Sequence, residues 1–198
     1  MAQKPKIDTF SSNSLKVLDR SVEEFIDKYE YNLSLFKKDD RAILGQKYHG
    51  LICAYLKGFD IEKMTLELEE RQKTIFKNFL NKIKLEKKSF IKTEYPFLIK
   101  DGLKGVPYYI TGRLDALHKK DDFYTIYDWK TLNLPKNAND DLQSIVYLYS
   151  LSKMVKSEKI KMRYISIEKF EFIDVEFDNC AKYKKRIDDI VEKYYNKK

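Results

Sequence analysis

The chain has 198 residues, of which 43% are hydrophobic and 14% aromatic, and it carries a formal net charge of +8. This composition excludes an intrinsically disordered chain, and the length suffices for a core that needs no disulfides. The basic balance suits a polyanionic partner such as nucleic acid. A compositional bias towards Lys would explain the same charge.

The first half of the chain is expected to be helical. Ser-Ser-Asn-Ser at 11–14 offers an N-cap, and apolar residues follow it at helical spacing. A second helix is predicted over about 41–57, with Gly58 at its end. A third helix is predicted over about 61–84.

The pattern changes to strands after residue 88. The segments 89–99, 108–117 and 123–129 are rich in β-branched and aromatic residues, and turn-like segments at 100–105 and 118–122 separate them. This order predicts a three-stranded antiparallel meander.

The remaining chain is predicted to form a helix over 140–154, a strand over 162–177 and a closing helix over 180–195. Together the elements predict an α/β fold, in which helices flank a mixed β-sheet and a helical segment comes first. Pro and Gly are scarce, at 4 and 6 residues, so we expect one domain over 1–198. Its helical part would span about 10–85, and its sheet and later helices about 86–198.

The two cysteines, Cys53 and Cys180, lie too far apart to form a disulfide framework or a C-x-x-C metal site. Cys53 lies in an apolar run, which predicts a buried side chain. No apolar stretch reaches the roughly 18–20 residues that a membrane helix needs, and residues 1–10 lack the apolar segment of a signal peptide. We therefore expect a cytoplasmic protein.

The second predicted strand contains Gly-Arg-Leu-Asp at 112–115, near its end, and Tyr-Asp-Trp-Lys at 127–130 follows after the hairpin. Side chains alternate between the faces of a strand, so Asp128 and Lys130 should project together while Trp129 points into the opposite layer. Antiparallel pairing through the intervening turn can bring the Asp115 carboxylate beside that of Asp128.

Two carboxylates held side by side repel each other, and burying them costs several kcal/mol unless a cation compensates. Carboxylate oxygens are ligands that Mg²⁺ and Mn²⁺ prefer. Lys130 could orient or help to deprotonate an attacking water and stabilise negative charge on a phosphate. A structural ion pair between Asp128 and Lys130 is the alternative. Among the 31 acidic residues, only Glu86 also has Lys two positions later, and it lies in a polar loop.

Two further groups could belong to the same site. Gln143 and Tyr147 share one face of the next helix and could offer an amide and a hydroxyl to a phosphate backbone. His49 lies in the second helix, where a neutral imidazole could complete a metal shell. The alternatives are an ordinary amphipathic helix and a histidine packed in the core. His118 falls in the predicted hairpin turn and is expected to be exposed.

In this order and spacing, these segments resemble the RecB-like branch of the PD-(D/E)xK nucleases. The motifs that carry the resemblance are Gly45…His49, Gly112…Asp115, Asp128-Trp129-Lys130 and Gln143…Tyr147. Residues 10–15 are similar to the opening helix of that branch, and Glu94 matches an acid often seen on its first core strand. The resemblance extends over about residues 10–177. Leu114, rather than proline, precedes Asp115.

The resemblance implies a restriction-endonuclease-like core that binds Mg²⁺ or Mn²⁺ and DNA. Asp115, Asp128 and Lys130 would be catalytic, and Glu94 would be either a further ligand or part of a structural salt bridge. The implied metal ligands are His49, Asp115, Asp128 and the Trp129 backbone carbonyl. Gln143 and Tyr147 would hold the DNA backbone or position the active site.

Many relatives carry an iron–sulfur cluster held by four cysteines. Here Asp19-Arg20-Ser21 stands where the first cysteine would fall, and Cys180 is alone near the C-terminus, so we expect no cluster. The expected activity is that of a stand-alone deoxyribonuclease, an exonuclease acting on single strands or DNA ends in repair, recombination or phage replication. A separate helicase or recombination protein is a candidate partner, and the oligomeric state is left open.

Two other activities remain open from the sequence. One is a nucleic-acid-binding subunit that has kept the fold and lost catalysis. The other is an endonuclease of the CRISPR-adaptation or restriction kind.

Overall fold

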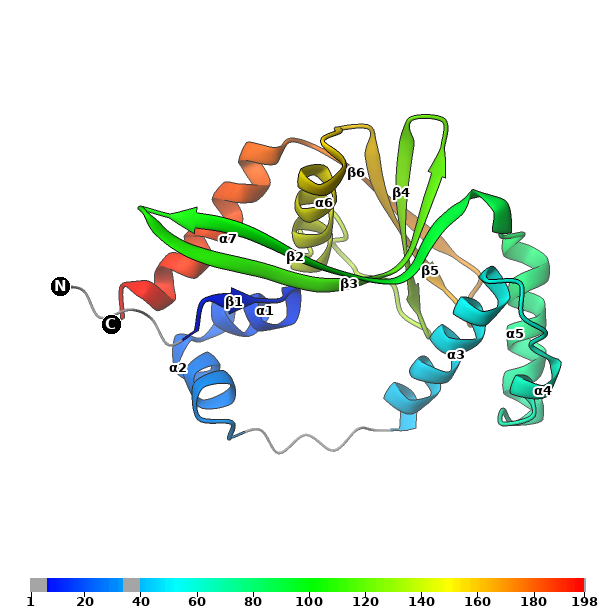
Figure 1. Ribbon diagram of the computed structural model, residues 1–198. Helices are drawn as coiled ribbons and strands as arrows, with labels where there is room; N and C mark the ends of the chain where they lie inside the picture. Colours follow the sequence, from blue (N-terminus) through cyan, green and yellow to red (C-terminus); the bar gives the residue numbers. More distant parts are fainter. Residues whose placement is uncertain (1–6, 34–39, 198) are drawn as a thin grey trace.

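A six-stranded mixed sheet forms the centre of the computed structural model, which describes residues 7–33 and 40–197. Its strands follow the order β1-β3-β4-β5-β6, and β2 pairs with β3 (Figure 1). The strands are β1 Thr9–Phe10, β2 Phe90–Leu103, β3 Val106–Lys120, β4 Phe123–Lys130, β5 Ile160–Ser166 and β6 Phe172–Glu176. The helices are α1 Ser12–Arg20, α2 Val22–Phe25, η1 Ile26–Glu30, α3 Asp40–Leu56, α4 Glu62–Thr65, α5 Glu70–Ile83, η2 Lys87–Ser89, α6 Leu142–Val155 and α7 Cys180–Tyr195.

The predicted meander is confirmed, because β2 pairs antiparallel with β3, and β3 with β4. The helix α6 then carries the chain to β5, which lies parallel to β4. β3 is the longest strand, and its two sides are paired differently. β2 follows one side along most of its length, whereas β1 and β4 occupy opposite ends of the other side.

Helices cover both faces of the sheet (Figure 1). On one face, α1, α6 and α7 form the larger core around fully buried side chains such as Leu15, Val146 and Ile187. On the other face, α3 and α5 pack on the sheet around Phe79 and Trp129. Trp129 therefore points away from α6, as strand alternation predicts.

The prediction of a single helix over about 61–84 is wrong in its extent. The segment forms two helices, α4 and α5, and the buried Leu68 lies between them. Glu69 and Gln72 then form a capping box that begins α5. This reciprocal pairing satisfies backbone donors at the new helix start, so two short helices replace one long one.

The strand predicted over 162–177 is also wrong in its extent, because a tight turn divides it into β5 and β6. The Ser166 hydroxyl accepts a hydrogen bond from the Lys169 backbone N–H, and Phe170 adopts a positive φ of 59°. The turn lets β6 fold back antiparallel to β5.

His118 is half-buried within β3 rather than exposed in a turn. The β3–β4 turn is shorter than predicted, and Asp121 takes its positive φ of 53°. The His118 ring packs edge-on against Phe90, with ring centroids 5.2 Å apart. Cys53, expected to be buried, is half-buried, and both cysteines are free thiols.

No helix in the described part of the chain combines the length and apolar character needed to cross a membrane. We expect residues 1–10 to lack the apolar segment of a signal peptide. Residues 1–6 of this stretch lie outside the described residues.

Candidate metal centre and its cleft

Three carboxylates stand in a row across the strands β2, β3 and β4. Glu94 lies opposite Asp115, between the cross-strand pairs formed by Thr93 with Ala116 and Tyr95 with Leu114. On the other side, Asp115 and Asp128 are the first residues beyond the last β3–β4 pair. We call Glu94, Asp115 and Asp128 the acidic row. Like charges that face each other across strands destabilise a sheet.

The row lies where β3 separates from β4. Among the described residues, 111–115 pair with no strand on the side that β1 and β4 occupy. The Tyr147 hydroxyl, on α6, donates a hydrogen bond of 3.1 Å to the Arg113 carbonyl in this gap. Burial and the charges of Asp128 and Asp115 raise the pKa of Tyr147 to about 12, so the hydroxyl keeps its proton.

His49 contacts the acidic row from α3. Its Nδ1 lies 3.3 Å from Asp115 Oδ1, and its Nε2 lies 2.9 Å from the Trp129 carbonyl oxygen. The second Asp115 oxygen accepts a hydrogen bond of 2.9 Å from the Trp129 N–H. Burial lowers the pKa of His49, but the hydrogen bond and charge of Asp115 outweigh it, so the pKa lies above its ordinary value.

Glu94 reaches the same place through an unusual backbone conformation. Its φ is 48°, a left-handed value that costs a residue with a side chain roughly 1–2 kcal/mol. One oxygen of each of Glu94 and Asp115 and one nitrogen of His49 all lie within 4.8 Å of one another. Glu94 also pairs with Arg113, with Nε and Oε2 3.0 Å apart. The structure thus contains both alternatives considered for Glu94, a candidate ligand set and a salt bridge.

Asp128 lies behind this cluster and is only 2% exposed. Its Oδ1 accepts a hydrogen bond of 2.6 Å from Gln143 Nε2, and its Oδ2 lies 2.7 Å from Lys130 Nζ. The triangle closes because Lys130 donates to Gln143 Oε1 at 2.9 Å. Burial and the nearby charge of Asp115 raise the pKa of Asp128, against the opposing effect of Lys130.

The glycines of the two Gly-containing motifs have steric roles here. A Cβ on Gly45 would lie 3.0 Å from Thr131 Oγ1, so this glycine lets α3 approach the end of β4. A Cβ on Gly112 would lie 2.5 Å from Phe97 Cζ and 3.2 Å from Tyr147 Cε1. The absence of a side chain at Gly112 therefore leaves room for the rings that place the Tyr147 hydroxyl.

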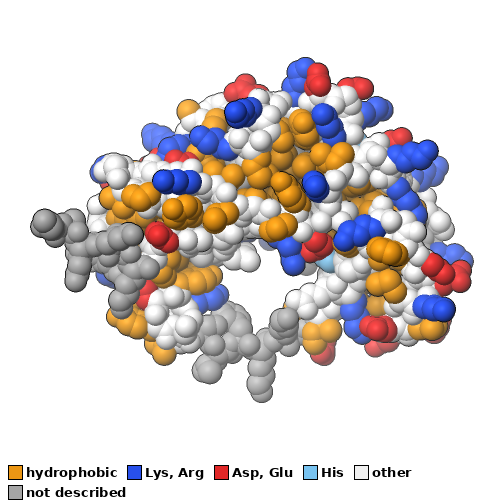
Figure 2. All heavy atoms as spheres, in the orientation of Figure 1, with side chains coloured by type: hydrophobic (Ala, Val, Ile, Leu, Met, Phe, Trp, Pro, Cys, Tyr) orange, Lys and Arg blue, Asp and Glu red, His pale blue; other side chains and the backbone are white. Residues whose placement is uncertain are grey.

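An open cleft of about 930 Å³ gives solvent access to the site. Figure 2 shows a hollow below the sheet, between the N-terminal helices and α3, with acidic and histidine side chains at its edge. His49, Glu94, Asp115 and Tyr147 line the cleft, whereas Asp128 and Lys130 lie beside it and are not among its lining residues.

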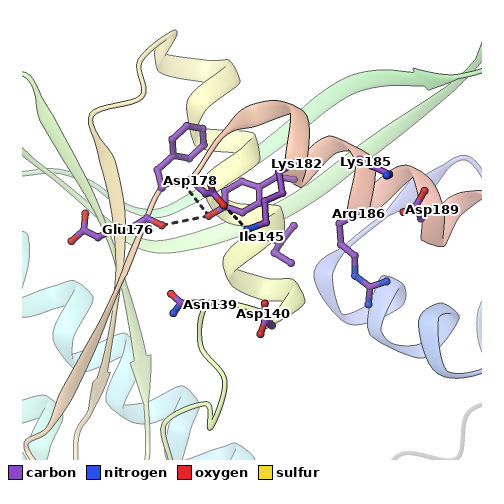
Figure 3. Close-up of a pocket in the computed structure, with 11 residues that line it drawn as sticks. Asn139, Asp140, Ile145, Glu176, Asp178, Lys182, Lys185, Arg186 and Asp189 are labelled. Atoms are coloured by element: carbon purple, nitrogen blue, oxygen red, sulfur yellow. Dashed lines mark hydrogen bonds and ion pairs between the residues drawn. The ribbon is translucent and has the colours of Figure 1, made fainter.

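A second cavity of about 880 Å³ lies at the start of α7 (Figure 3). Acidic and basic side chains line it together, including Asp178, Lys182 and Arg186. Asp178 and Lys182 already form an ion pair with each other. None of the candidate site residues lines this cavity.

Sequence reasoning missed that the N-cap and first two residues of α1 line the cleft, which are Ser11, Ser12 and Asn13. The Ser-Ser-Asn-Ser segment predicted a helix cap, but no local signal places that cap beside His49. The proximity arises from the pairing of β1 with β3, since β1 leads directly into α1.

The donors fit a divalent cation, because imidazole nitrogen and carboxylate oxygens from three separate elements converge in an open cleft. The fold and the site together define a class: an α/β protein equipped for metal-assisted hydrolysis of phosphodiester bonds. A family model described as the PD-(D/E)XK nuclease superfamily matches residues 14–196. The chain belongs to this superfamily of nucleases, which use divalent metals.

Solved structures confirm the fold class. Twenty-one chains of known structure match this protein. One, titled "Crystal structure of SSO0001", is 18% identical with a TM-score of 0.58, and the match covers 96% of this chain and 79% of that chain. At this identity the likeness establishes the mixed-sheet, restriction-endonuclease-like fold alone. No curated protein matches the chain.

Proposed function

We propose that this protein is a RecB-like deoxyribonuclease that depends on Mg²⁺ or Mn²⁺ and degrades single strands or DNA ends. The observation that carries the proposal is the acidic row, with His49 in contact with it at the wall of an open cleft. Carboxylates on neighbouring strands repel one another, and a bound divalent cation would offset this repulsion. The net charge of +8 agrees with a polyanionic substrate.

The metal would be held by His49 and Asp115, with Glu94, Asp128 and the Trp129 carbonyl as the further donors beside them. Bound there, a divalent ion would polarise the phosphodiester and lower the pKa of a water molecule. His49 contacts both Asp115 and the Trp129 carbonyl. It therefore holds the two oxygens in a fixed relation before any ligand arrives.

Lys130 would contribute a positive charge to the reacting phosphate. Its ammonium group is held by Asp128 and Gln143, and 29% of its side chain is exposed. A cation fixed in this way needs little reorganisation as negative charge develops on the phosphate oxygens. The same group can orient an attacking water.

Gln143 would act mainly as a positioning residue. Its amide donates to Asp128 and accepts from Lys130, so both of its polar atoms serve the catalytic side chains. Of the two roles implied for Gln143, these contacts favour positioning of the active site over binding of the DNA backbone. Tyr147 supports the site in a similar way, because its hydroxyl donates to the backbone of β3.

A cleavage assay tests the proposal. Purified protein is incubated with end-labelled DNA, single- and double-stranded, linear and circular, in Mg²⁺, Mn²⁺ or EDTA. Lys130→Ala is compared with Lys88→Ala, which removes the same charge from the exposed Glu86-x-Lys88 segment. We expect metal-dependent degradation of linear DNA that Lys130→Ala abolishes and Lys88→Ala retains.

Other outcomes select the alternative functions. Cleavage of circles would indicate an endonuclease. Binding of DNA without cleavage in either metal would indicate a nucleic-acid-binding subunit. For Glu94, a loss of cleavage in Glu94→Gln with unchanged thermal stability would identify a ligand, and a loss of stability alone would identify a structural salt bridge.

A further inference from the structure

The N-terminal end of α1 lines the catalytic cleft and has unused hydrogen-bond donors. Ser11 and Ser14 satisfy each other in a capping box, in which each side chain accepts from the other's backbone N–H. The backbone N–H groups of Ser12 and Asn13, the first two positions of this nine-residue helix, have no hydrogen-bond partner among the described residues. The first turn also contains no acidic residue.

Ser12 provides a second, independent feature. The residue is only 6% exposed, yet it lines the cleft and its hydroxyl makes no hydrogen bond within the described part of the chain. Polar side chains of buried residues normally find a partner. Ser12 and Asn13 thus bring an unpaired hydroxyl, an exposed amide and two unpaired backbone N–H groups to the lining of one cleft.

We propose that this end of α1 binds a phosphate group of the nucleic-acid strand whose scissile bond lies at the acidic row. Free N–H groups and the positive end of the helix dipole favour an anion. Glu94 and Asp115 line the same cleft, so α1 supplies favourable electrostatics where these two carboxylates repel phosphate. Arg113, which pairs with Glu94, also lines the cleft.

The inference rests on the proposed nuclease function and adds a phosphate subsite to it. The phosphate could be an internal phosphodiester or a phosphate at the end of the strand. Both offer the same oxygen acceptors to N–H and O–H donors. A terminal phosphate held here would fix which end of a strand enters the site.

The test measures binding separately from cleavage. All proteins carry Asp128→Asn, and fluorescence anisotropy follows a short labelled single-stranded oligonucleotide with a 5′-phosphate, a 3′-phosphate or no terminal phosphate. Asn13→Asp adds an acid at the second helical position, where acids stabilise a helix through its dipole. Ala181→Asp is the matched control, because it makes the same addition at the second position of α7, beside the second cavity.

We expect Asn13→Asp to weaken binding by roughly tenfold or more and Ser12→Ala by roughly three- to tenfold. Thermal unfolding should show that both variants keep the stability of their parent, and Ala181→Asp should bind as the parent does. Equal weakening for all three oligonucleotides would identify an internal phosphodiester. Loss of a preference for one phosphorylated end would identify a terminal phosphate.

The proposal is overturned if Asn13→Asp binds like Ala181→Asp, or if no oligonucleotide binds the parent. A parent that binds DNA through α1, together with a wild-type protein that cuts nothing, would leave the phosphate site standing and remove the nuclease function. Cleavage by the wild type, together with unaltered binding in both α1 variants, would remove the phosphate site and leave the nuclease function standing.

Discussion

Two clusters of charged side chains in this protein have opposite electrostatic characters. The first is the acidic row. The second, which we call the Asp101 network, joins the far end of β2 and β3 to α6 and α7 and comprises Asp101, Tyr108, Tyr149, Lys184 and Asp188. The Lys184 ammonium lies 3.0 Å from a carboxylate oxygen of Asp101 and 2.8 Å from one of Asp188. The Tyr149 hydroxyl donates a hydrogen bond to Asp101. The Tyr108 hydroxyl donates a hydrogen bond of 2.7 Å to Asp188.

The pKa shifts separate the two clusters. Burial raises the pKa of Asp101, but hydrogen bonds from Tyr149 and Lys184 outweigh it, and the pKa lies below its ordinary value. At Asp128, burial and the charge of Asp115 prevail, and the pKa is raised. Hydrogen bonds that lower the pKa of a carboxylate stabilise the fold, whereas a buried carboxylate whose pKa is raised is maintained at a cost to stability. We infer that the second arrangement serves a ligand.

Substitution of Asp128 should have the largest effect, and it should fall on activity. Asp128→Asn removes a like charge from the acidic row and keeps the shape of the side chain. We expect cleavage to fall by at least about a thousandfold, equivalent to about 4 kcal/mol of transition-state stabilisation, with unchanged or higher stability. Single-turnover cleavage and urea unfolding measure the two quantities. A large loss of stability would show that Asp128 stabilises the fold, as we infer for Asp101.

Asp101→Asn should show the opposite pattern. It removes the charge that Tyr149 and Lys184 stabilise, so we expect the free energy of unfolding to fall by about 2–3 kcal/mol. Cleavage measured well below the unfolding temperature should be unchanged. A comparable loss of cleavage in the fully folded variant would show that the two clusters are coupled.

Two tyrosines on α6 give a finer comparison, since each ring stays buried when its hydroxyl is removed. Tyr149→Phe loses a hydrogen bond to a charged group and should destabilise the fold by about 1.5–3 kcal/mol without affecting cleavage. Tyr147→Phe loses a hydrogen bond to the Arg113 carbonyl and should cost about 0.5–1.5 kcal/mol. It should also reduce cleavage several-fold, because the backbone beside Asp115 loses its support. Equal effects of the two variants on stability and on cleavage would contradict the assignment of Tyr149 to the fold and of Tyr147 to the site.

The pH dependence of stability should give the smallest effect. The folded-state pKa of Asp101 lies below its unfolded value, so its contribution is present above the unfolded value of about 3.9 and is lost as the pH falls through the folded one. The stability gap between wild type and Asp101→Asn should therefore narrow on acidification below about pH 4. Urea unfolding across this range measures the gap, and a constant gap would show that Asp101 does not stabilise through its charge.

Local periodicity sufficed to predict which faces of β4 the side chains of the candidate site occupy. Trp129 packs edge-on against Phe79 of α5, with ring centroids 6.1 Å apart, while Asp128 faces Gln143 of α6. Alternation along β4 gives this result directly. The spacing of Gln143 and Tyr147 likewise placed both on one helical face.

The rest of the site depends on contacts between distant segments. Glu94 reaches the acidic row through a positive φ that no residue preference predicts. Ser12 reaches the cleft because β1 pairs with β3, which lies a hundred residues later in the chain. The Asp101 network draws on β2, β3, α6 and α7, so it becomes visible only when the sheet register is known.

The most direct test of the central claim is the effect of Mn²⁺ on thermal unfolding. A ligand that binds only the folded state, at about 100 times its Kd, stabilises by about 2.7 kcal/mol, or roughly 5–10 °C in Tm for a chain of this size. We predict this rise for the wild type and for Asp101→Asn, and its loss in Asp115→Asn. An equal rise in all three proteins, or none in the wild type, would contradict the assignment of the acidic row as a metal site.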